Sequence, residues 1–165
     1  MNFKNLREYF KVLIIYFISN VISVLVVPLF VKNEFSREEY KNYLIPIIIF
    51  TIIYIILISI FKVNKKAVIV SFIVIYFLVS TLLISDVFSM KGLTPNDVSF
   101  LGVQYITFIS LYTTLPFQML IYMLMGYNIE DYSYIILAIY LIVMSIIIYM
   151  IDKFRDFKET NKKRV

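Results

Sequence analysis

The sequence predicts an all-α integral membrane protein with four transmembrane helices and one longer hydrophobic segment that proline interrupts. Four stretches of 19 or 20 residues contain no charged side chain, and a helix needs about 20 apolar residues to cross the ~30 Å hydrocarbon core of a bilayer. Hydrophobic residues make up 61% of the 165-residue chain and charged residues 16%, and the mean hydropathy is +0.87. The run Tyr43–Phe61 is apolar on every side, which is typical of a helix solvated by lipid or by other apolar helices.

We therefore expect one polytopic membrane domain over residues 1–165. Its transmembrane helices are predicted at about 12–31, 42–61, 67–85 and 132–151. The first resembles a signal peptide because Lys4, Arg7 and Lys11 precede it. Its apolar run of 20 residues exceeds the ~7–15 residues of a signal-peptide core, and no small-x-small cleavage site follows before Lys32. An uncleaved first helix is therefore expected.

The fifth stretch has 32 uncharged residues, from Val98 to Ile129. A helix of this length would extend about 48 Å, whereas two complete crossings would need roughly 40 residues. Thr94-Pro95 is typical of a helix start, and Gly126 followed by Asn128 is typical of a helix stop. Pro116 interrupts the run between them because proline lacks an amide donor.

Two structures fit segment 95–126. The first is a re-entrant pair of half-helices, 95–112 and 116–126, which turns inside the membrane at Thr113-Thr114. The second is one tilted helix kinked at Pro116. A polar stripe favours the second structure, because its five side chains would fall within an arc of about 120° on an unbroken helix. The five residues are Gln104, Thr107, Ser110, Thr114 and Gln118. The length of the segment and the distribution of charge favour the first, which we expect.

The distribution of Lys and Arg predicts that both termini are cytoplasmic. Basic residues in short loops accumulate on the cytoplasmic side of a membrane protein. If segment 95–126 does not cross, cytoplasmic termini place 12 of the 16 Lys and Arg residues inside, including those of the basic tail 152–165. If the segment crosses, the better orientation places 10 inside. An even number of crossings is therefore expected.

The chain contains no Cys, His or Trp. Disulfides, haem or zinc sites with thiolate or imidazole ligands, and Ser-His-Asp triads are therefore excluded. Hard-cation sites built from carboxylates and carbonyls remain open. The sequence contains no nucleotide-binding loop, metallopeptidase motif or dinucleotide fingerprint. We expect no catalytic residue, no cofactor and no bound metal.

Three groups of polar residues are candidate functional positions. The polar stripe of the fifth segment consists of Gln104, Thr107, Ser110, Thr114 and Gln118. Facing lipid would be costly for these side chains, so we expect them to face protein, water or a substrate. Because none of them is ionisable, hydrogen bonds between helices are the simpler interpretation and a wet cavity is the functional alternative.

The second group lies in the first predicted helix and consists of Ser19, Asn20 and Ser23. Small residues four positions apart let two helices approach closely, and an Asn can hydrogen-bond across the contact. We expect a packing contact, and the alternative is a residue that lines a substrate path.

The third group is a predicted outer acidic face. Its members are Asp86, Asp97, Glu130 and Asp131. We expect these carboxylates to mark helix ends at the water boundary. The alternative is a surface that attracts a cation or a basic peptide.

These observations predict a small membrane protein that acts non-catalytically through other membrane components, as an accessory subunit, a regulator or an immunity-type protein. The alternative is a small transporter or channel subunit in which segment 95–126 lines the path. An intramembrane enzyme that uses Asp86 with Glu130 or Asp131 has the least support. The expected partners are the lipid bilayer and another membrane protein or a second copy of the chain, and no nucleic acid. Abundant Ile, Lys, Asn, Tyr and Phe favour an AT-rich bacterial genome and therefore a bacterial plasma membrane.

Overall fold

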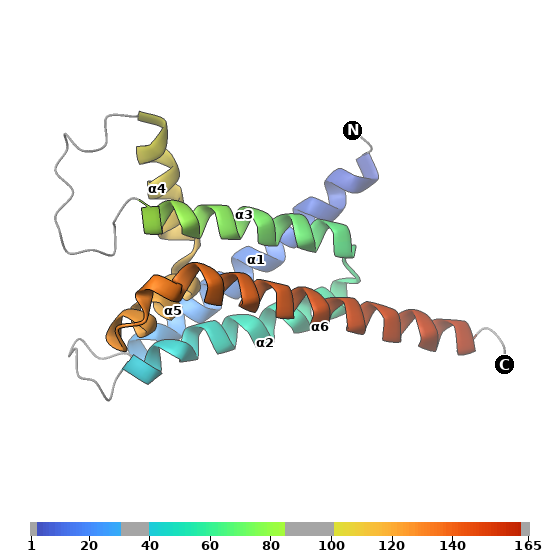
Figure 1. Ribbon diagram of the computed structural model, residues 1–165. Helices are drawn as coiled ribbons and strands as arrows, with labels where there is room; N and C mark the ends of the chain where they lie inside the picture. The colour runs from blue at the N-terminus through green and yellow to red at the C-terminus, as the bar shows by residue number, and fades with distance from the viewer. Residues whose placement is uncertain (1–2, 31–39, 85–100, 163–165) are drawn as a thin grey trace.

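The computed structural model describes residues 3–30, 40–84 and 101–162, and every regular element in these ranges is helical (Figure 1). Four of the described helices are long and apolar enough to cross a membrane: α1 (Phe3–Phe30), α2 (Leu44–Phe61), α3 (Lys65–Ile84) and α6 (Ser133–Lys162). The shorter elements are α4 (Leu101–Thr113), α5 (Leu115–Gly126) and the 3-10 turns η1 (Tyr40–Tyr43) and η2 (Glu130–Tyr132). The all-helical class and the four long apolar helices are confirmed.

The N-terminal end of α1 and the C-terminal end of α6 extend beyond the charge-free stretches. α1 begins at Phe3 and not near residue 12, and α6 continues to Lys162 through most of the predicted basic tail. Charge marks the boundary of the hydrocarbon core, whereas a helix needs only backbone hydrogen bonds. Lys, Arg and Glu are good helix formers, so both helices continue into their charged turns.

The long helices run up and down, so both ends of the chain lie at the same end of the bundle (Figure 1). α1 runs away from the N-terminus, α2 returns, α3 runs out again and α6 returns to the C-terminus. We call the end that holds both termini and the α2–α3 turn the terminal end, and the opposite end the loop end. α4 and α5 lie between α3 and α6 in the chain and occupy the loop end.

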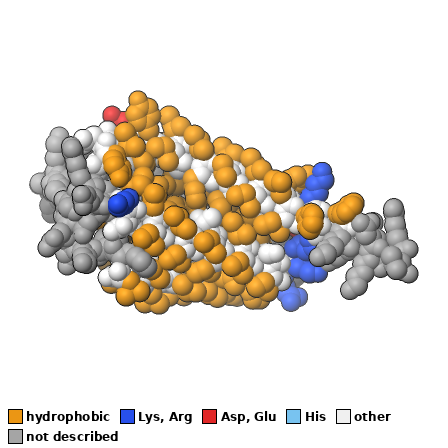
Figure 2. Space-filling view, turned by 90° about the horizontal axis from the view of Figure 1, so that it is seen from below, with side chains coloured by type: hydrophobic (Ala, Val, Ile, Leu, Met, Phe, Trp, Pro, Cys, Tyr) orange, Lys and Arg blue, Asp and Glu red, His pale blue; other side chains and the backbone are white. Residues whose placement is uncertain are grey.

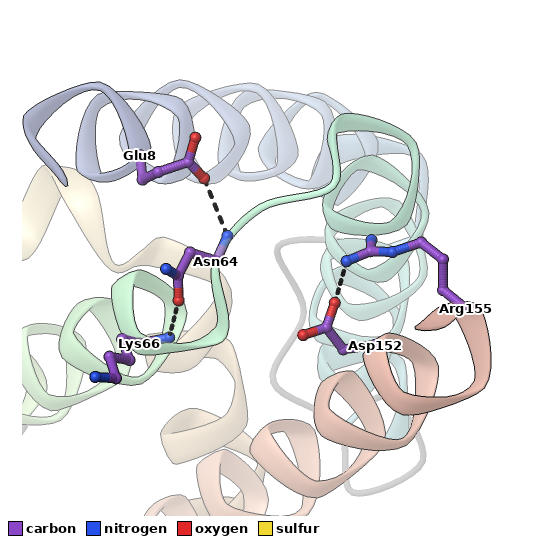
Figure 3. Close-up of polar contacts among 5 residues, drawn as sticks. All are labelled: Glu8, Asn64, Lys66, Asp152 and Arg155. Atoms are coloured by element: carbon purple, nitrogen blue, oxygen red, sulfur yellow. Dashed lines mark hydrogen bonds and ion pairs between the residues drawn. The ribbon is translucent and has the colours of Figure 1, made fainter. Parts of the chain in front are cut away.

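Glu8 attaches α1 to the α2–α3 turn at the terminal end (Figure 3). Its Oε2 accepts a hydrogen bond from the backbone N–H of Asn64 at 3.0 Å, and its Oε1 pairs with Nζ of Lys11 at 2.7 Å. Asn64 caps α3, because its Oδ1 accepts from the backbone N–H of Lys66 at 2.9 Å. One carboxylate therefore joins α1 to the turn between α2 and α3.

Aromatic rings form the centre of the bundle. Phe50 of α2 has no exposed surface, and its ring centre lies 5.6 Å from that of Tyr16 on α1 and 5.2 Å from that of Phe117 on α5. Phe50 also stacks on Tyr54 at 5.4 Å, and Phe117 meets Tyr140 of α6 at 6.0 Å. Four helices therefore share one aromatic cluster.

The exterior is apolar around the middle of the bundle and basic at the terminal end. Figure 2 shows hydrophobic side chains covering the middle, with Lys and Arg side chains gathered at one end. Phe17, Ile73 and Met150 are each more than 60% exposed. The basic residues of the terminal end with described side chains are Arg7, Lys11, Lys62, Lys65, Lys66, Lys153 and Arg155. At the loop end the exposed charged side chains described are Lys41 and Asp131. This surface is compatible with a membrane location.

Candidate functional site

The chain breaks sharply between α4 and α5. The two helices are bent by 88°, and Thr114 lies between them with non-helical angles of φ −116° and ψ 22°. Pro116 lies in the first turn of α5, where its missing N–H costs nothing. If α4 continued straight, the Pro116 ring would collide with the carbonyl of Tyr112, one turn earlier. The proline therefore ends α4 and begins α5.

The α4–α5 pair enters and leaves the bundle at the loop end (Figure 1). α4 packs against α3, and α5 packs against α2 and the η1 turn. α5 ends at Gly126, and Asn128 just beyond it has a left-handed φ of 56°, as the helix-stop pattern predicts. The expected helix start at Thr94-Pro95 lies outside the described residues. The described geometry is that of two helices that meet at one sharp bend, which fits a broken span as well as a re-entrant loop.

The break would leave the last carbonyl groups of α4 without donors. Gln118 folds back across it and donates from Nε2 to the carbonyl of Leu111 at 2.7 Å and to Oγ1 of Thr114 at 3.2 Å. Thr114 Oγ1 in turn donates to the carbonyl of Ser110 at 2.7 Å. Ser110 and Thr114 are fully buried, and Gln118 is 2% exposed. Thr114 and Gln118 therefore bind the backbone of the break, whereas the hydroxyl of Ser110 donates to the carbonyl of Ile106 within α4.

Two donors from α1 bind the carbonyl of Thr113. Tyr16 donates its hydroxyl at 2.5 Å, and Asn20 donates from Nδ2 at 2.9 Å. Residues four apart lie on the same face of a helix, so both donors reach one acceptor. A carbonyl oxygen has two lone pairs, and here both are used. The sequence predicts an interhelical hydrogen bond from Asn20, whereas Tyr16 lies in an apolar run and gives no such signal.

The serines of the first helix lie at close contacts. Ser19 and Ser23 have no exposed surface, and their hydroxyls return to carbonyls of α1, those of Ile15 and Asn20, each at 2.8 Å. Both hydroxyls therefore bind α1 itself, and the two small side chains add little bulk to the surface of this helix. α1 packs most extensively against α2 and then against α3. The burial of Ser19 and Ser23 is compatible with the packing contact expected from the sequence.

α3 holds the other side of α4. Oγ1 of Thr81 lies 3.1 Å from Oγ of Ser110, so a hydroxyl pair joins the two helices one turn before the break. Similar pairs lie deeper in the bundle: Thr51 meets the hydroxyl of Tyr140 at 2.6 Å, and Tyr54 meets Ser71 at 3.3 Å. Hydroxyl groups therefore provide the polar contacts between the apolar helices.

Two buried oxygen atoms near the break lack a protein partner among the described residues. They are Oδ1 of Asn20 and Oγ1 of Thr107. Asn20 contacts the break directly through its other amide atom, and Thr107 lies one turn before Ser110 on α4. A buried acceptor without a donor is unfavourable, so both atoms offer a position for a small hydrogen-bonding molecule.

Of the remaining predicted residues, the structure describes the side chain of Asp131. The side chain of Gln104 lies outside the described part of the structure, and so do Asp86, Asp97 and the side chain of Glu130. Asp131 is exposed at the loop end. No group of three carboxylates that could hold a metal ion occurs within the described residues.

Comparison of the chain with protein-family models, curated proteins and solved structures finds no match. The chemistry of the site is hydrogen bonding by hydroxyl and amide groups.

Thr114→Val should lower the free energy of unfolding by ~1–3 kcal/mol, because it removes a buried hydroxyl and leaves Gln118 without one acceptor. The matched control is Thr113→Val. The hydroxyl of Thr113 lies at the surface and binds only the carbonyl of Ile109, at 2.8 Å, so that change should cost less than ~0.5 kcal/mol. Thermal unfolding of both variants in detergent measures the difference. Equal losses would show that the break does not depend on Thr114.

A double-mutant cycle should reveal the shared acceptor. Tyr16→Phe and Asn20→Leu each leave one donor on the Thr113 carbonyl, whereas the double variant leaves a buried carbonyl without any. The double variant should therefore lose ~1 kcal/mol or more beyond the sum of the single losses. Tyr140→Phe combined with Asn20→Leu is the control, because Tyr140 pairs with Thr51 and its effect should add. If the losses in the free energy of unfolding simply add in both pairs of variants, Tyr16 and Asn20 do not share an acceptor.

Proposed function

We propose that the chain is a multi-pass protein of a bacterial plasma membrane. α1, α2, α3 and α6 cross the bilayer, and α4 with α5 re-enters it from the outer side. The support is the apolar exterior around the middle of the bundle and the basic residues of the terminal end. Because basic residues accumulate on the cytoplasmic side, both termini are cytoplasmic in this proposal.

Within the membrane the protein acts non-catalytically through another membrane component, as an accessory subunit, a regulator or an immunity-type protein. The observation that carries this proposal is the use of the polar groups at the break. Ser110, Thr114 and Gln118 are buried and bind the backbone of their own segment. These groups bind the backbone on both sides of the bend, which supports a structural role for them.

The outer faces of the helices are the surface that a partner would contact. On α1, Phe10, Leu13 and Phe17 follow one another at helical spacing, and each is more than 60% exposed. Helices in a membrane associate by packing and by hydrogen bonds between them. A face with two aromatic rings offers a large packing area to a neighbouring helix.

The second candidate function is a small transporter or channel subunit. It is favoured by Oδ1 of Asn20 and Oγ1 of Thr107, which are buried beside a break in the helix. Broken helices line the binding sites of many transporters. Thr107→Val and Asn20→Leu would then lower solute flux into vesicles, whereas flux that is equal in all variants would leave the first proposal alone.

Photo-crosslinking should identify a stoichiometric neighbour. A photoreactive amino acid at position 17, where Phe17 is 64% exposed, should join the chain to a partner or to a second copy in intact membranes. The same group at position 50, where Phe50 has no exposed surface, should crosslink only within the chain. A purified protein that stays monomeric and gives no adduct at position 17 would contradict action through a partner.

Topology reporters should give the same cytoplasmic signal at both termini. A reporter fused before Met1 and another fused after Val165 test the orientation directly. A third reporter between α5 and α6, at Asn128, should report the outer side. Opposite signals at the two termini would mean an odd number of crossings and would overturn re-entry of α4–α5.

A further inference from the structure

A groove runs along the outside of the bundle between α3 and α6. It has a volume of about 270 Å³ and is lined by Ile69, Phe72 and Tyr76 of α3 and by Ala138, Leu141 and Ser145 of α6, with further apolar side chains. From Ile69 to Tyr76 the groove extends about 10 Å at ~1.5 Å per residue.

Two small residues keep the groove open. Ala138 and Ser145 lie two turns apart on one face of α6, so neither fills the space next to α3. The hydroxyl of Ser145 turns inward and donates to the carbonyl of Leu141 at 2.9 Å. The wall of α6 is therefore apolar towards the groove.

The groove leads to a pair of residues that joins α3 and α6 at the terminal end. Lys65 lies one turn before Ile69 on α3, and Tyr149 lies one turn after Ser145 on α6. Nζ of Lys65 lies 4.8 Å from the centre of the Tyr149 ring. A cation is therefore held about 6 Å beyond the lining residues, at ~1.5 Å per residue.

More positive charge surrounds this pair. Lys66 is exposed and lies two turns before Ile73, another lining residue, and Lys153 is exposed one turn beyond Tyr149. Two acidic side chains are described near this end of the groove: Asp152 is paired with Arg155 (Figure 3), and Glu8, which lies beside Lys66, is paired with Lys11. The terminal end of the groove therefore carries net positive charge, while its interior is apolar.

We propose that this groove binds one acyl chain of an anionic phospholipid, with the lipid phosphate at Lys65 and Lys66. The proposal rests on the membrane insertion of the protein proposed above. α3 is apolar from the turn that follows these lysines, so their ammonium groups lie at the depth of the lipid head groups. Lys donates up to three hydrogen bonds and suits a phosphate at this boundary.

The size of the groove favours a lipid chain over a second helix. A helix is about 10 Å across, so a neighbouring helix would lie on the groove and not within it. A neighbouring helix could insert single side chains here, whereas an extended hydrocarbon chain follows the groove along its length. The basic end then matches a charged head group attached to that chain.

Native mass spectrometry of the full chain, released from vesicles with equal phosphatidylglycerol and phosphatidylcholine, tests the proposal. We expect one retained lipid, with phosphatidylglycerol preferred by about tenfold or more. Lys65→Gln with Lys66→Gln should reduce that preference to near one. Lys41→Gln, at the loop end, is the matched control and should leave the preference unchanged.

A second pair of variants tests the groove itself. Ala138→Phe fills the groove and should lower retention of both lipids at least tenfold, and Ser145→Leu fills its other half as an independent check. Ile139→Phe is the control, because Ile139 is 55% exposed and lies outside the lining. Retention in that variant should match the wild type.

Several outcomes would overturn the lipid site. These are equal retention of the two lipids by the wild type, full retention by both groove-filling variants, release of phosphatidylglycerol by millimolar inorganic phosphate alone, or a dimer that Ala138→Phe dissolves. Flotation of alkali-washed vesicles separates this failure from that of the membrane proposal. A chain that does not float with vesicles would contradict both the membrane proposal and the lipid site. A chain that floats but shows no lipid preference would contradict the lipid site alone.

Discussion

The fold depends on the requirement that every backbone carbonyl buried away from water finds a donor. A straight helix meets this requirement by itself, but the sharp turn between α4 and α5 does not. The carbonyl groups of Leu111 and Thr113 receive their donors from Gln118 and from α1. The turn therefore exists only in a bundle that places α1 against it, and the bent segment and the first helix form one unit.

The long helices could be predicted because their cause is local: a bilayer requires about 20 uncharged residues wherever a helix crosses it. The ends of α5 could also be predicted, since Pro116 and Asn128 determine the conformation of their own backbone. The donor that Tyr16 supplies to the break could not be predicted. Tyr16 lies 97 residues from Thr113 in the chain, and a tyrosine in an apolar run gives no sign of which carbonyl its hydroxyl will meet.

The spacing of the polar stripe favours an unbroken helix, although the helix is broken in the structure. Projected onto a straight helix, Ser110, Thr114 and Gln118 share one face, which favoured an unbroken helix. In the structure the helix breaks in the middle of the stripe, and the same three residues stay together because Gln118 reaches back over the gap. Residues that would align along a straight helix can thus also meet around a sharp bend, so helical spacing alone does not distinguish the two arrangements.

The double acceptor at Thr113 also imposes an order on biogenesis. Tyr16 and Asn20 leave the ribosome long before residue 113, so both donors have been made when the segment that needs them is synthesised. Had the sequence carried α1 after α6, the carbonyl of Thr113 would have had neither donor until the last helix was made. In this chain order, the helix that supplies the donors is therefore synthesised before the bend that needs them.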